Sequence, residues 1–329
     1  MSIPKVIVVA SLSLFLLIGV LAFFKKNSAN KENNIETISY EETVEAAPIQ
    51  LDEIKQIEKS NGLISPIVDE LAKQEVDEVW RLFTTGKQKF PIVETVKYQS
   101  RVSWLKGRPA WITDYATHYA TSRHFIARSL NGNLDYFTQK VSTGDYFNVF
   151  KIDKAINFHL LLDLSRCKMW FYYHDLDNNE RVLLKTYKVG LGRFDTNTES
   201  GILTPKGKFI LGQKVAIYKP GVMGYVHDEE AEMVQTFGTR WIPFYEEQSA
   251  EGRNSSGYGI HGAPWIYDEE TKTYKENLET IGQYDSDGCI RLAEVDMEEL
   301  FSIVLTKPTI LHIVTDFKEA ELPGIVGAY

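Results

Sequence analysis

The second half of the chain alternates short apolar runs with glycine and turn residues, and this pattern limits the possible fold more than any other feature. Apolar runs cover residues 158–164, 168–173, 182–189 and 309–314, and a typical turn covers residues 177–180. Runs of this length that are bounded by turn residues predict β-strands. Because few helical patterns interrupt them, they predict a mostly β fold, either a β-sandwich or a partly open barrel.

A second constraint is an uncharged apolar stretch at residues 6–24, which matches the roughly 20 residues that a helix needs to cross a bilayer. Lysines flank it on both sides, so the positive charges do not fix its orientation. A cleavable signal peptide has a shorter apolar core and small residues at its cleavage site, whereas this stretch ends in LAFFKK. We therefore predict an uncleaved signal-anchor helix over residues 1–26, with a cleaved signal peptide as the alternative.

Three segments separate this stretch from the β-rich half. Residues 27–50 are polar and acidic and predict a flexible tether. Apolar residues return at helical spacing from Leu51, and residues 51–97 predict a helical segment. Residues 98–153 predict a small α+β module.

Within this module, the patterns predict a strand at residues 102–105, helices that begin near Pro109 and Arg123, and a strand after Gly144. The order strand–helix–helix–strand, with the segments IARSLNG and TGDYFNVF, resembles a lysin-motif (LysM) module. The resemblance implies binding of glycan that contains N-acetylglucosamine. A helical spacer that binds no ligand is the alternative.

Composition narrows the function. The chain has 329 residues and a formal net charge of −9, which gives no support for a nucleic-acid partner. Its two cysteines are too few for a disulfide scaffold or a cysteine-rich zinc site. Metal-binding spacings such as HExxH and CxxC do not occur, so we predict neither a metal nor a cofactor.

Two motifs concentrate the chemistry: YGIHG at residues 258–262 and SDGCIRL at residues 286–292. A lone cysteine with a distant histidine is a candidate thiol nucleophile, because a free thiol with a pKa near ~8.5 needs a base to form thiolate at neutral pH. Gly288 permits a tight turn whose N–H groups can face a developing oxyanion. Cys167 lies between two predicted strands and is interpreted as a structural residue.

These motifs resemble the signature of the YkuD-type L,D-transpeptidases, which is His-Gly followed by Ser/Thr-His-Gly-Cys-hydrophobic-Arg. Upstream, the segments LDLS, VGLG and TPKG are similar to the opening strands of that family and to its Thr-Pro-x-Gly step. The resemblance covers about residues 158–315. It implies an L,D-transpeptidase-type β-sandwich catalytic domain, which we assign to residues 156–316, followed by a C-terminal tail at residues 317–329.

The resemblance also implies roles for individual residues. Cys289 is the expected nucleophile and His261 the expected base, with the backbone carbonyl of Gly262 holding the imidazole. Backbone N–H groups of Gly288 and Cys289 are the expected oxyanion donors. Four further residues are expected to shape the site or contact the substrate: Tyr258, Ser286, Asp287 and Arg291.

Two features depart from the family pattern. Asp287 stands where the motif usually has its second histidine, and a carboxylate there opposes thiolate formation unless it points away or pairs with a cation such as Arg291. The spacing between the two motifs is also longer than usual, and residues 265–278 predict a charged surface loop as the extra length. Residues 213–256, rich in aromatic side chains, are the candidate active-site lid.

The resemblance implies a peptidoglycan L,D-transpeptidase that forms 3→3 cross-links. Its expected partners are peptidoglycan stem peptides, glycan strands and, through residues 1–26, the cytoplasmic membrane. The expected location is the cell envelope, with the catalytic domain in the periplasm or wall space. An L,D-carboxypeptidase and a non-catalytic peptidoglycan-binding protein are the alternatives. A free catalytic thiol also predicts that Cys167 and Cys289 form no disulfide.

Overall fold

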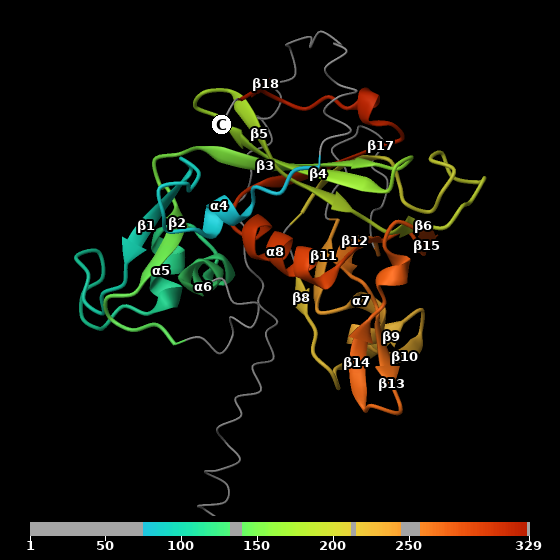
Figure 1. Cartoon of the computed structure of the whole chain (residues 1–329), viewed down its shortest axis with the longest axis horizontal. Helices are drawn as coiled ribbons and strands as arrows, with labels where there is room; N and C mark the ends of the chain where they lie inside the picture. Colours follow the sequence, from blue (N-terminus) through green and yellow to red (C-terminus); the bar gives the residue numbers. More distant parts are fainter. Residues whose placement is uncertain (1–74, 132–139, 212–214, 245–256, 328–329) are drawn as a thin grey trace, which may run out of the picture. The chain divides into compact units, whose positions relative to one another are not determined.

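A computed structural model describes residues 75–131, 140–211, 215–244 and 257–327 (Figure 1). All of them belong to one unit, residues 42–329. The predicted anchor at residues 1–26, the tether at residues 27–50 and the greater part of the predicted helical segment lie outside these ranges. Within the ranges, no helix is long and apolar enough to span a bilayer.

The largest element of the fold is a six-stranded sheet with the strand order β18-β5-β4-β3-β17-β7. Strands β3, β4 and β5 form an antiparallel meander, and β17 lies parallel to β3. The four apolar runs of the sequence become β3, β4, β5 and β17, so the mostly β prediction is confirmed for this region. The bounds are β3 (Ile156–Asp163), β4 (Lys168–Asp175), β5 (Glu180–Lys188), β7 (Gly207–Ile210), β17 (Thr309–Val314) and β18 (Ile325–Val326).

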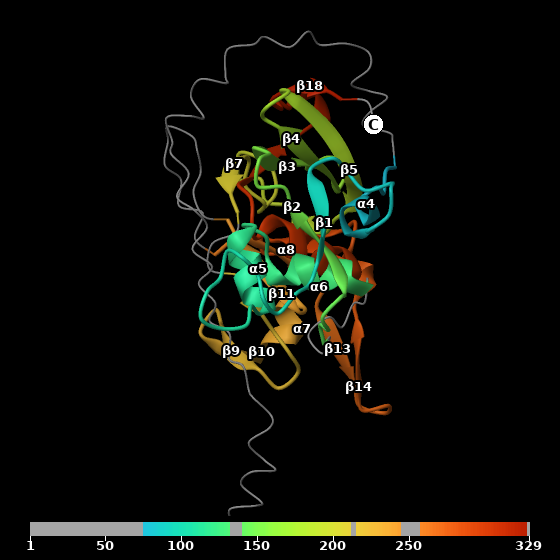
Figure 2. The ribbon, with the colours of Figure 1, turned by 90° about the vertical axis from the view of Figure 1, so that its left-hand side faces the viewer.

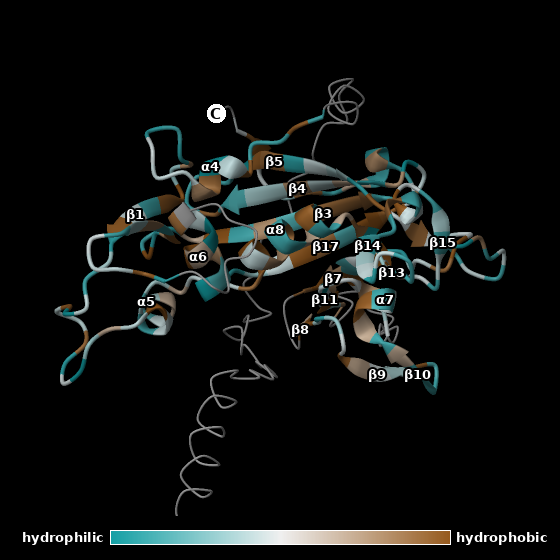
Figure 3. Cartoon of the chain, turned by 60° about the horizontal axis from the view of Figure 1, so that its bottom comes forward, coloured by the Kyte–Doolittle hydropathy of each residue, from teal (hydrophilic) through white to brown (hydrophobic). Residues whose placement is uncertain are grey.

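A smaller sheet has four strands in the order β16-β12-β11-β8. They are β8 (Ala216–Ile217), β11 (Arg240–Pro243), β12 (Gly259–Gly262) and β16 (Ile290–Leu292). Helix α8 (Glu294–Val304) lies beside β11 and β12 (Figure 1). Residues of both sheets and of α8 share one buried core, which includes Leu160, Phe209, Ile260, Ile290 and Phe301. In Figure 3 hydrophobic residues are prominent on β3 and β17.

Short paired strands and helices surround the smaller sheet. The strand β6 (Leu191–Gly192) lies parallel to β15 (Tyr284–Ser286). One hairpin joins β9 (Met223–Val226) to β10 (Glu229–Glu232) and leads into α7 (Met233–Phe237). A second hairpin joins β13 (Trp265–Asp268) to β14 (Thr273–Glu276), and the single turn η2 (Leu278–Thr280) follows it.

The second hairpin corrects the prediction of a charged surface loop over residues 265–278. Its strands place Tyr267 directly opposite Tyr274, with ring centroids 4.9 Å apart. Aromatic cross-strand pairs of this kind stabilise antiparallel strands. The charged residues that suggested a loop form the turn and its ion pairs, such as Lys275 with Asp268.

The N-terminal module has the predicted order of elements but different bounds. After the short helix α4 (Trp80–Phe83), it consists of β1 (Val93–Lys97), α5 (Ile112–His118), α6 (Arg123–Asn131) and β2 (Tyr146–Phe150). Strands β1 and β2 pair along their whole length. The first strand was expected at residues 102–105, where only an isolated bridge between Val102 and Leu105 forms.

The boundary at residue 98 is therefore corrected, because it cuts off a strand that lies in the segment predicted to be helical. The sequence of β1, VETVK, carries the β-branched residues that favour a strand. Pro91 precedes it and interrupts the helical pattern.

The module and the β-rich half share part of one hydrophobic core, and the module also has a smaller cluster of its own around Tyr115 and Phe147. Phe125 of α6 and Phe150 of β2 are fully buried, and Phe150 contacts Phe158 of β3 with ring centroids 5.8 Å apart. The Ser122 hydroxyl also donates a hydrogen bond to the backbone carbonyl of Ser302 in α8 (2.9 Å). Figure 2 shows α6 beside α8. The module is thus packed into the larger fold, not held by a linker alone.

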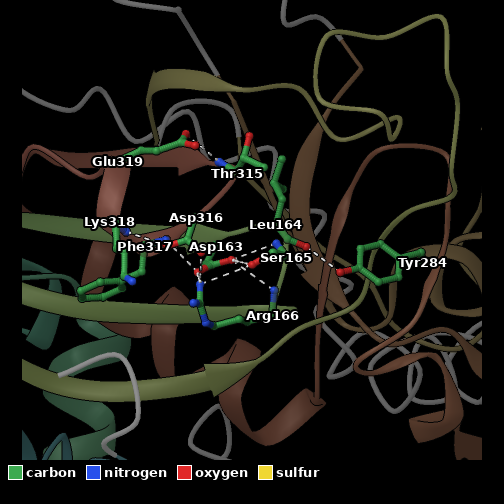
Figure 4. A network of polar contacts seen from close by, with 10 residues as sticks. All are labelled: Asp163, Leu164, Ser165, Arg166, Tyr284, Thr315, Asp316, Phe317, Lys318 and Glu319. Carbon is green, nitrogen blue, oxygen red and sulfur yellow. Dashed lines mark hydrogen bonds and ion pairs between the residues drawn. The ribbon is translucent and has the colours of Figure 1, made fainter. Parts of the chain in front are cut away.

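Residues 317–327, predicted as part of a C-terminal tail, are an ordered part of the fold. The fully buried carboxylate of Asp163 accepts hydrogen bonds from Ser165 in the β3–β4 turn and from the backbone N–H of Phe317 (Figure 4). Phe317, in η3 (Phe317–Glu319), packs on Trp170 with ring centroids 4.5 Å apart. The segment then runs on to β18, which pairs with β5. A buried carboxylate thus fixes the return of the chain over the outer face of the larger sheet.

Candidate active site

Cys289 lies in a tight turn between β15 and β16, and its side chain is largely buried. The turn depends on Gly288, whose φ of +115° favours glycine. A Cβ atom at this position would lie 2.3 Å from Cε1 of Tyr258 and 2.9 Å from the carbonyl oxygen of Leu203. Glycine is therefore required both by the backbone conformation and by the lack of space.

Ser286 closes the same turn. Its hydroxyl donates to the carbonyl oxygen of Cys289 (2.7 Å) and accepts from the N–H of Gly288 (3.2 Å). The Gly288 N–H, an expected oxyanion donor, is therefore engaged by Ser286 in this structure. Its hydrogen bond is long, so a stronger acceptor such as an oxyanion can compete for it.

His261 lies in β12, next to the strand that follows Cys289. These strands are parallel and place His261 opposite Arg291. Cys289 directly precedes β16, and its sulfur lies 3.8 Å from the carbonyl oxygen of Gly257, two residues before β12 begins. Phe237 and Trp241 pack on the imidazole, with ring centroids 5.3 Å and 5.7 Å away.

The hydrogen bond made by His261 sets its tautomer. Nδ1 lies 2.7 Å from the carbonyl oxygen of Gly262. A carbonyl only accepts, so Nδ1 carries the proton and Nε2 keeps a lone pair. This is the contact that the resemblance implied for Gly262. The imidazole is thus held in the form that can accept a proton at Nε2.

Burial favours the neutral forms of the Cys289 thiol and the His261 imidazole. It raises the pKa of the Cys289 thiol to about 11, an effect that the nearby Arg291 guanidinium weakens and the Asp287 carboxylate strengthens. Burial also lowers the pKa of His261 to about 3. Without a substrate, the favoured pair is therefore a thiol and a neutral imidazole rather than a thiolate and an imidazolium.

Comparison with known proteins shows the family of the domain that contains this site. Residues 157–313 match the model of the YkuD family, whose description is "L,D-transpeptidase catalytic domain". Residues 157–313 are a YkuD domain. The match begins at residue 157, so it leaves the N-terminal module unidentified. None of the curated proteins matches the chain.

Two solved structures are similar to the chain at low identity. One is the helical cell shape determining protein Pgp2 from Campylobacter jejuni, with 16% identity, a TM-score of 0.32, and coverage of 51% of this chain and 50% of that chain. The other is Bd1075 from Bdellovibrio bacteriovorus, with 16% identity, a TM-score of 0.32, and coverage of 48% of each chain. The similarity thus spans about half the length of these proteins.

The charged residues of the site form two separate ion pairs. Arg291 pairs with Asp285, so it is not the cation that neutralises Asp287. The partner of Asp287 is Arg193, which follows β6. Arg193 could not be predicted as a site residue, because no local pattern links residues that are 94 positions apart.

Tyr258, an expected substrate contact, packs over Gly288 and against the core of the YkuD domain. Of the candidate lid at residues 213–256, the described part forms β8 to β11 and α7, and its residues Phe237 and Trp241 line the imidazole. Cys167 and Cys289 are both free. Within the described ranges, no three histidine, cysteine, aspartate or glutamate residues are grouped to hold a metal ion.

Proposed function

We propose that the YkuD domain is a peptidoglycan L,D-transpeptidase with Cys289 as its nucleophile. One observation carries the proposal: Nδ1 of His261 is held by the carbonyl oxygen of Gly262 at 2.7 Å, in the strand that pairs with β16, which directly follows Cys289. Cysteine acyl transfer requires a base that is held in one tautomer within reach of the thiol.

In the first half-reaction, the Cys289 sulfur attacks the carbonyl carbon that follows the third residue of a tetrapeptide stem. Nε2 of His261 takes the thiol proton as the C–S bond forms. Backbone N–H groups of Cys289 and Gly288 bind the oxyanion, the latter by exchanging its bond to Ser286. The C–N bond then breaks, and the amine of the terminal D-alanine leaves with the proton from His261, so that a thioester remains.

In the second half-reaction, an amine of a neighbouring stem attacks the thioester. His261 accepts a proton from that amine and returns it to the departing sulfur, which forms a 3→3 cross-link and restores the thiol. Attack by water instead releases a tripeptide stem, which is the carboxypeptidase reaction. Tyr258, Ser286, Asp287 and Arg291 surround this site as candidates for shaping it or contacting the stem.

The proposed substrate also bears on location. Stem peptides lie outside the cytoplasmic membrane, so the proposed activity places the YkuD domain in the cell envelope. Attachment through residues 1–26 stays a prediction, since these residues lie outside the described ranges. Glycan binding by the N-terminal module also stays a prediction. If the module binds glycan, Trp111→Ala, which removes an exposed aromatic ring, is expected to reduce the amount of protein that sediments with insoluble peptidoglycan.

Incubation of the purified protein with a disaccharide-tetrapeptide, followed by mass spectrometry, tests the proposal. A cross-linked dimer that has lost one D-alanine supports a transpeptidase. Monomeric tripeptide alone means a carboxypeptidase, and unchanged substrate means a non-catalytic binder. Cys289→Ala is expected to abolish turnover, whereas Cys167→Ala, which removes the other free cysteine, is expected to retain it. Turnover by Cys289→Ala would falsify the assignment of the nucleophile.

A further inference from the structure

The ion pair between Arg193 and Asp287 occupies the rim of the candidate active site. Asp287 stands two residues before Cys289, and Arg193 directly follows β6, the strand that is paired with β15. Both side chains are more than half exposed, at 60% for Arg193 and 55% for Asp287. The pair thus joins two loops at the surface beside the thiol.

The backbones of these loops are also in close contact. The N–H of Arg193 donates to the carbonyl oxygen of Ser286 (2.9 Å). At Gly192, a Cβ atom would lie 3.0 Å from Cα of Gly288 and 2.6 Å from the nitrogen of Thr204. These contacts fix the backbone of Arg193 against the turn, and its guanidinium reaches Asp287 from there.

The charges around the thiol show why this delivery matters. The charged groups that act on the Cys289 thiol are Arg291 of β16 and Asp287 of the turn itself. His261 lies in the adjacent strand β12, and Tyr258 packs over Gly288. His261 is neutral, and Arg291 is already paired with Asp285. Asp287 is thus the anion closest in sequence to the sulfur, and Arg193 is its partner in the structure.

We propose that Arg193 is a positioning residue of the thiol site: by pairing with Asp287, it neutralises a carboxylate that would otherwise oppose formation of the Cys289 thiolate. This inference rests on the proposed function, in which that thiolate forms during acyl transfer. It accounts for the tolerance of an acidic residue where the YkuD motif usually has histidine.

Alkylation by iodoacetamide measures the thiolate without any peptidoglycan substrate. The sulfur displaces iodide and forms a thioether, and the thiol proton goes to the buffer. Rates are measured between pH 7 and 10 on the full chain carrying Cys167→Ala, so that only Cys289 reacts. The variants are Arg193→Ala, Arg193→Lys, Asp287→Asn and the double variant Arg193→Ala/Asp287→Asn. Arg108→Ala is the matched control, because it removes the arginine of an exposed ion pair with Asp114 in the N-terminal module.

Arg193→Ala is expected to slow alkylation about three- to tenfold at a fixed pH, which corresponds to a rise of about half to one unit in the pKa of the thiol. Arg193→Lys and the double variant are expected to react like the parent, since neither leaves an unpaired carboxylate. Asp287→Asn is expected to react at least as fast as the parent, and Arg108→Ala at the parent rate.

An Arg193→Ala rate equal to that of Arg108→Ala overturns the proposal. So does a double variant as slow as Arg193→Ala, because the arginine would then act through loop shape and not through charge. If Arg193→Ala does not fold, the proposal is overturned when Asp287→Asn is alkylated more slowly than the parent. The proposed function fails separately if the protein does not turn over the disaccharide-tetrapeptide. In that case the alkylation rates can still agree with the expectations above.

Discussion

Replacing Gly288 by alanine tests whether the turn that holds Cys289 depends on a residue without a side chain. The φ of +115° costs an L-residue about 1–3 kcal/mol of backbone strain. The added methyl group would also lie 2.3 Å from Cε1 of Tyr258, a ring packed against the core, and such overpacking costs about 1–3 kcal/mol more. The free energy of unfolding is therefore expected to fall by about 2–6 kcal/mol.

Gly107 provides a matched control for the steric part of this loss. Its φ is +90°, but a Cβ atom there would have no heavy atom within 4 Å. Gly107→Ala therefore pays only the backbone strain, which the lower entropy of the unfolded chain offsets by about 0.4–1 kcal/mol. The two variants are expected to differ by about 1–3 kcal/mol, which is the cost of overpacking alone.

Urea unfolding followed by tryptophan fluorescence measures both free energies, and iodoacetamide alkylation reports whether the thiol environment changes. Tyr258→Ala in the Gly288→Ala background removes the ring and is expected to recover the overpacking part but not the strain. If Gly288→Ala and Gly107→Ala lose the same free energy, Tyr258 does not confine the turn and the steric argument is wrong.

Three further predictions concern stability. Lowering the pH from 7 to 5.5 is expected to lower the free energy of unfolding. Burial lowers the pKa of His124, His261 and His312 to about 3, so these side chains stay neutral in the folded state but take up protons in the unfolded state. At a pH one unit below its unfolded pKa, each histidine lowers the free energy of unfolding by about 1 kcal/mol. Burial raises the pKa of Glu294 to about 7, so its protonation stabilises the folded state as the pH falls through the same range. Glu294→Gln is therefore expected to make the free energy of unfolding fall more steeply with pH. A urea midpoint that does not change between pH 7 and 5.5 refutes the reasoning. Lys185→Met leaves Asp77, Asp296 and Glu299 without their shared cation, and is expected to lower the free energy of unfolding by about 3 kcal/mol. Urea unfolding measures this loss against the control Lys272→Met, which removes an exposed lysine. Equal stability of the two variants contradicts the prediction. Phe125→Ala, outside the YkuD domain, is expected to lower the stability of the whole chain by about 3–5 kcal/mol in a single transition, and two separate transitions would show that the shared core does not couple the parts.

Four strands of the larger sheet, β3, β4, β5 and β17, were predictable because their signal is local. Each consists of apolar residues between turn residues, as with β3, β4 and the turn at residues 177–180. The His261–Gly262 contact could also be expected, since adjacent residues make it and the motif surrounds it. These features depend on residues that are close together in the sequence.

Other features escaped prediction because their causes are distant in the sequence. The pairing of Arg193 with Asp287 depends on β6 lying beside β15. The order of residues 317–327 depends on the buried Asp163, about 150 residues earlier in the chain. In each case one partner carries no local sign of the other.

The parallel pairing of β17 with β3 has a consequence for how the chain acquires its structure. About 150 residues separate the two strands, and the whole candidate active site lies between them in the sequence. During synthesis, β3 therefore leaves the ribosome long before the strand that will lie beside it, and the Cys289 turn is also complete before β17 exists. Closing such a long loop is slow, since the entropy of the intervening chain is lost before the contacts are gained. We expect the thiol to become buried late, only after the end of the domain has been made, so that a nascent chain exposes a reactive cysteine that the finished fold protects.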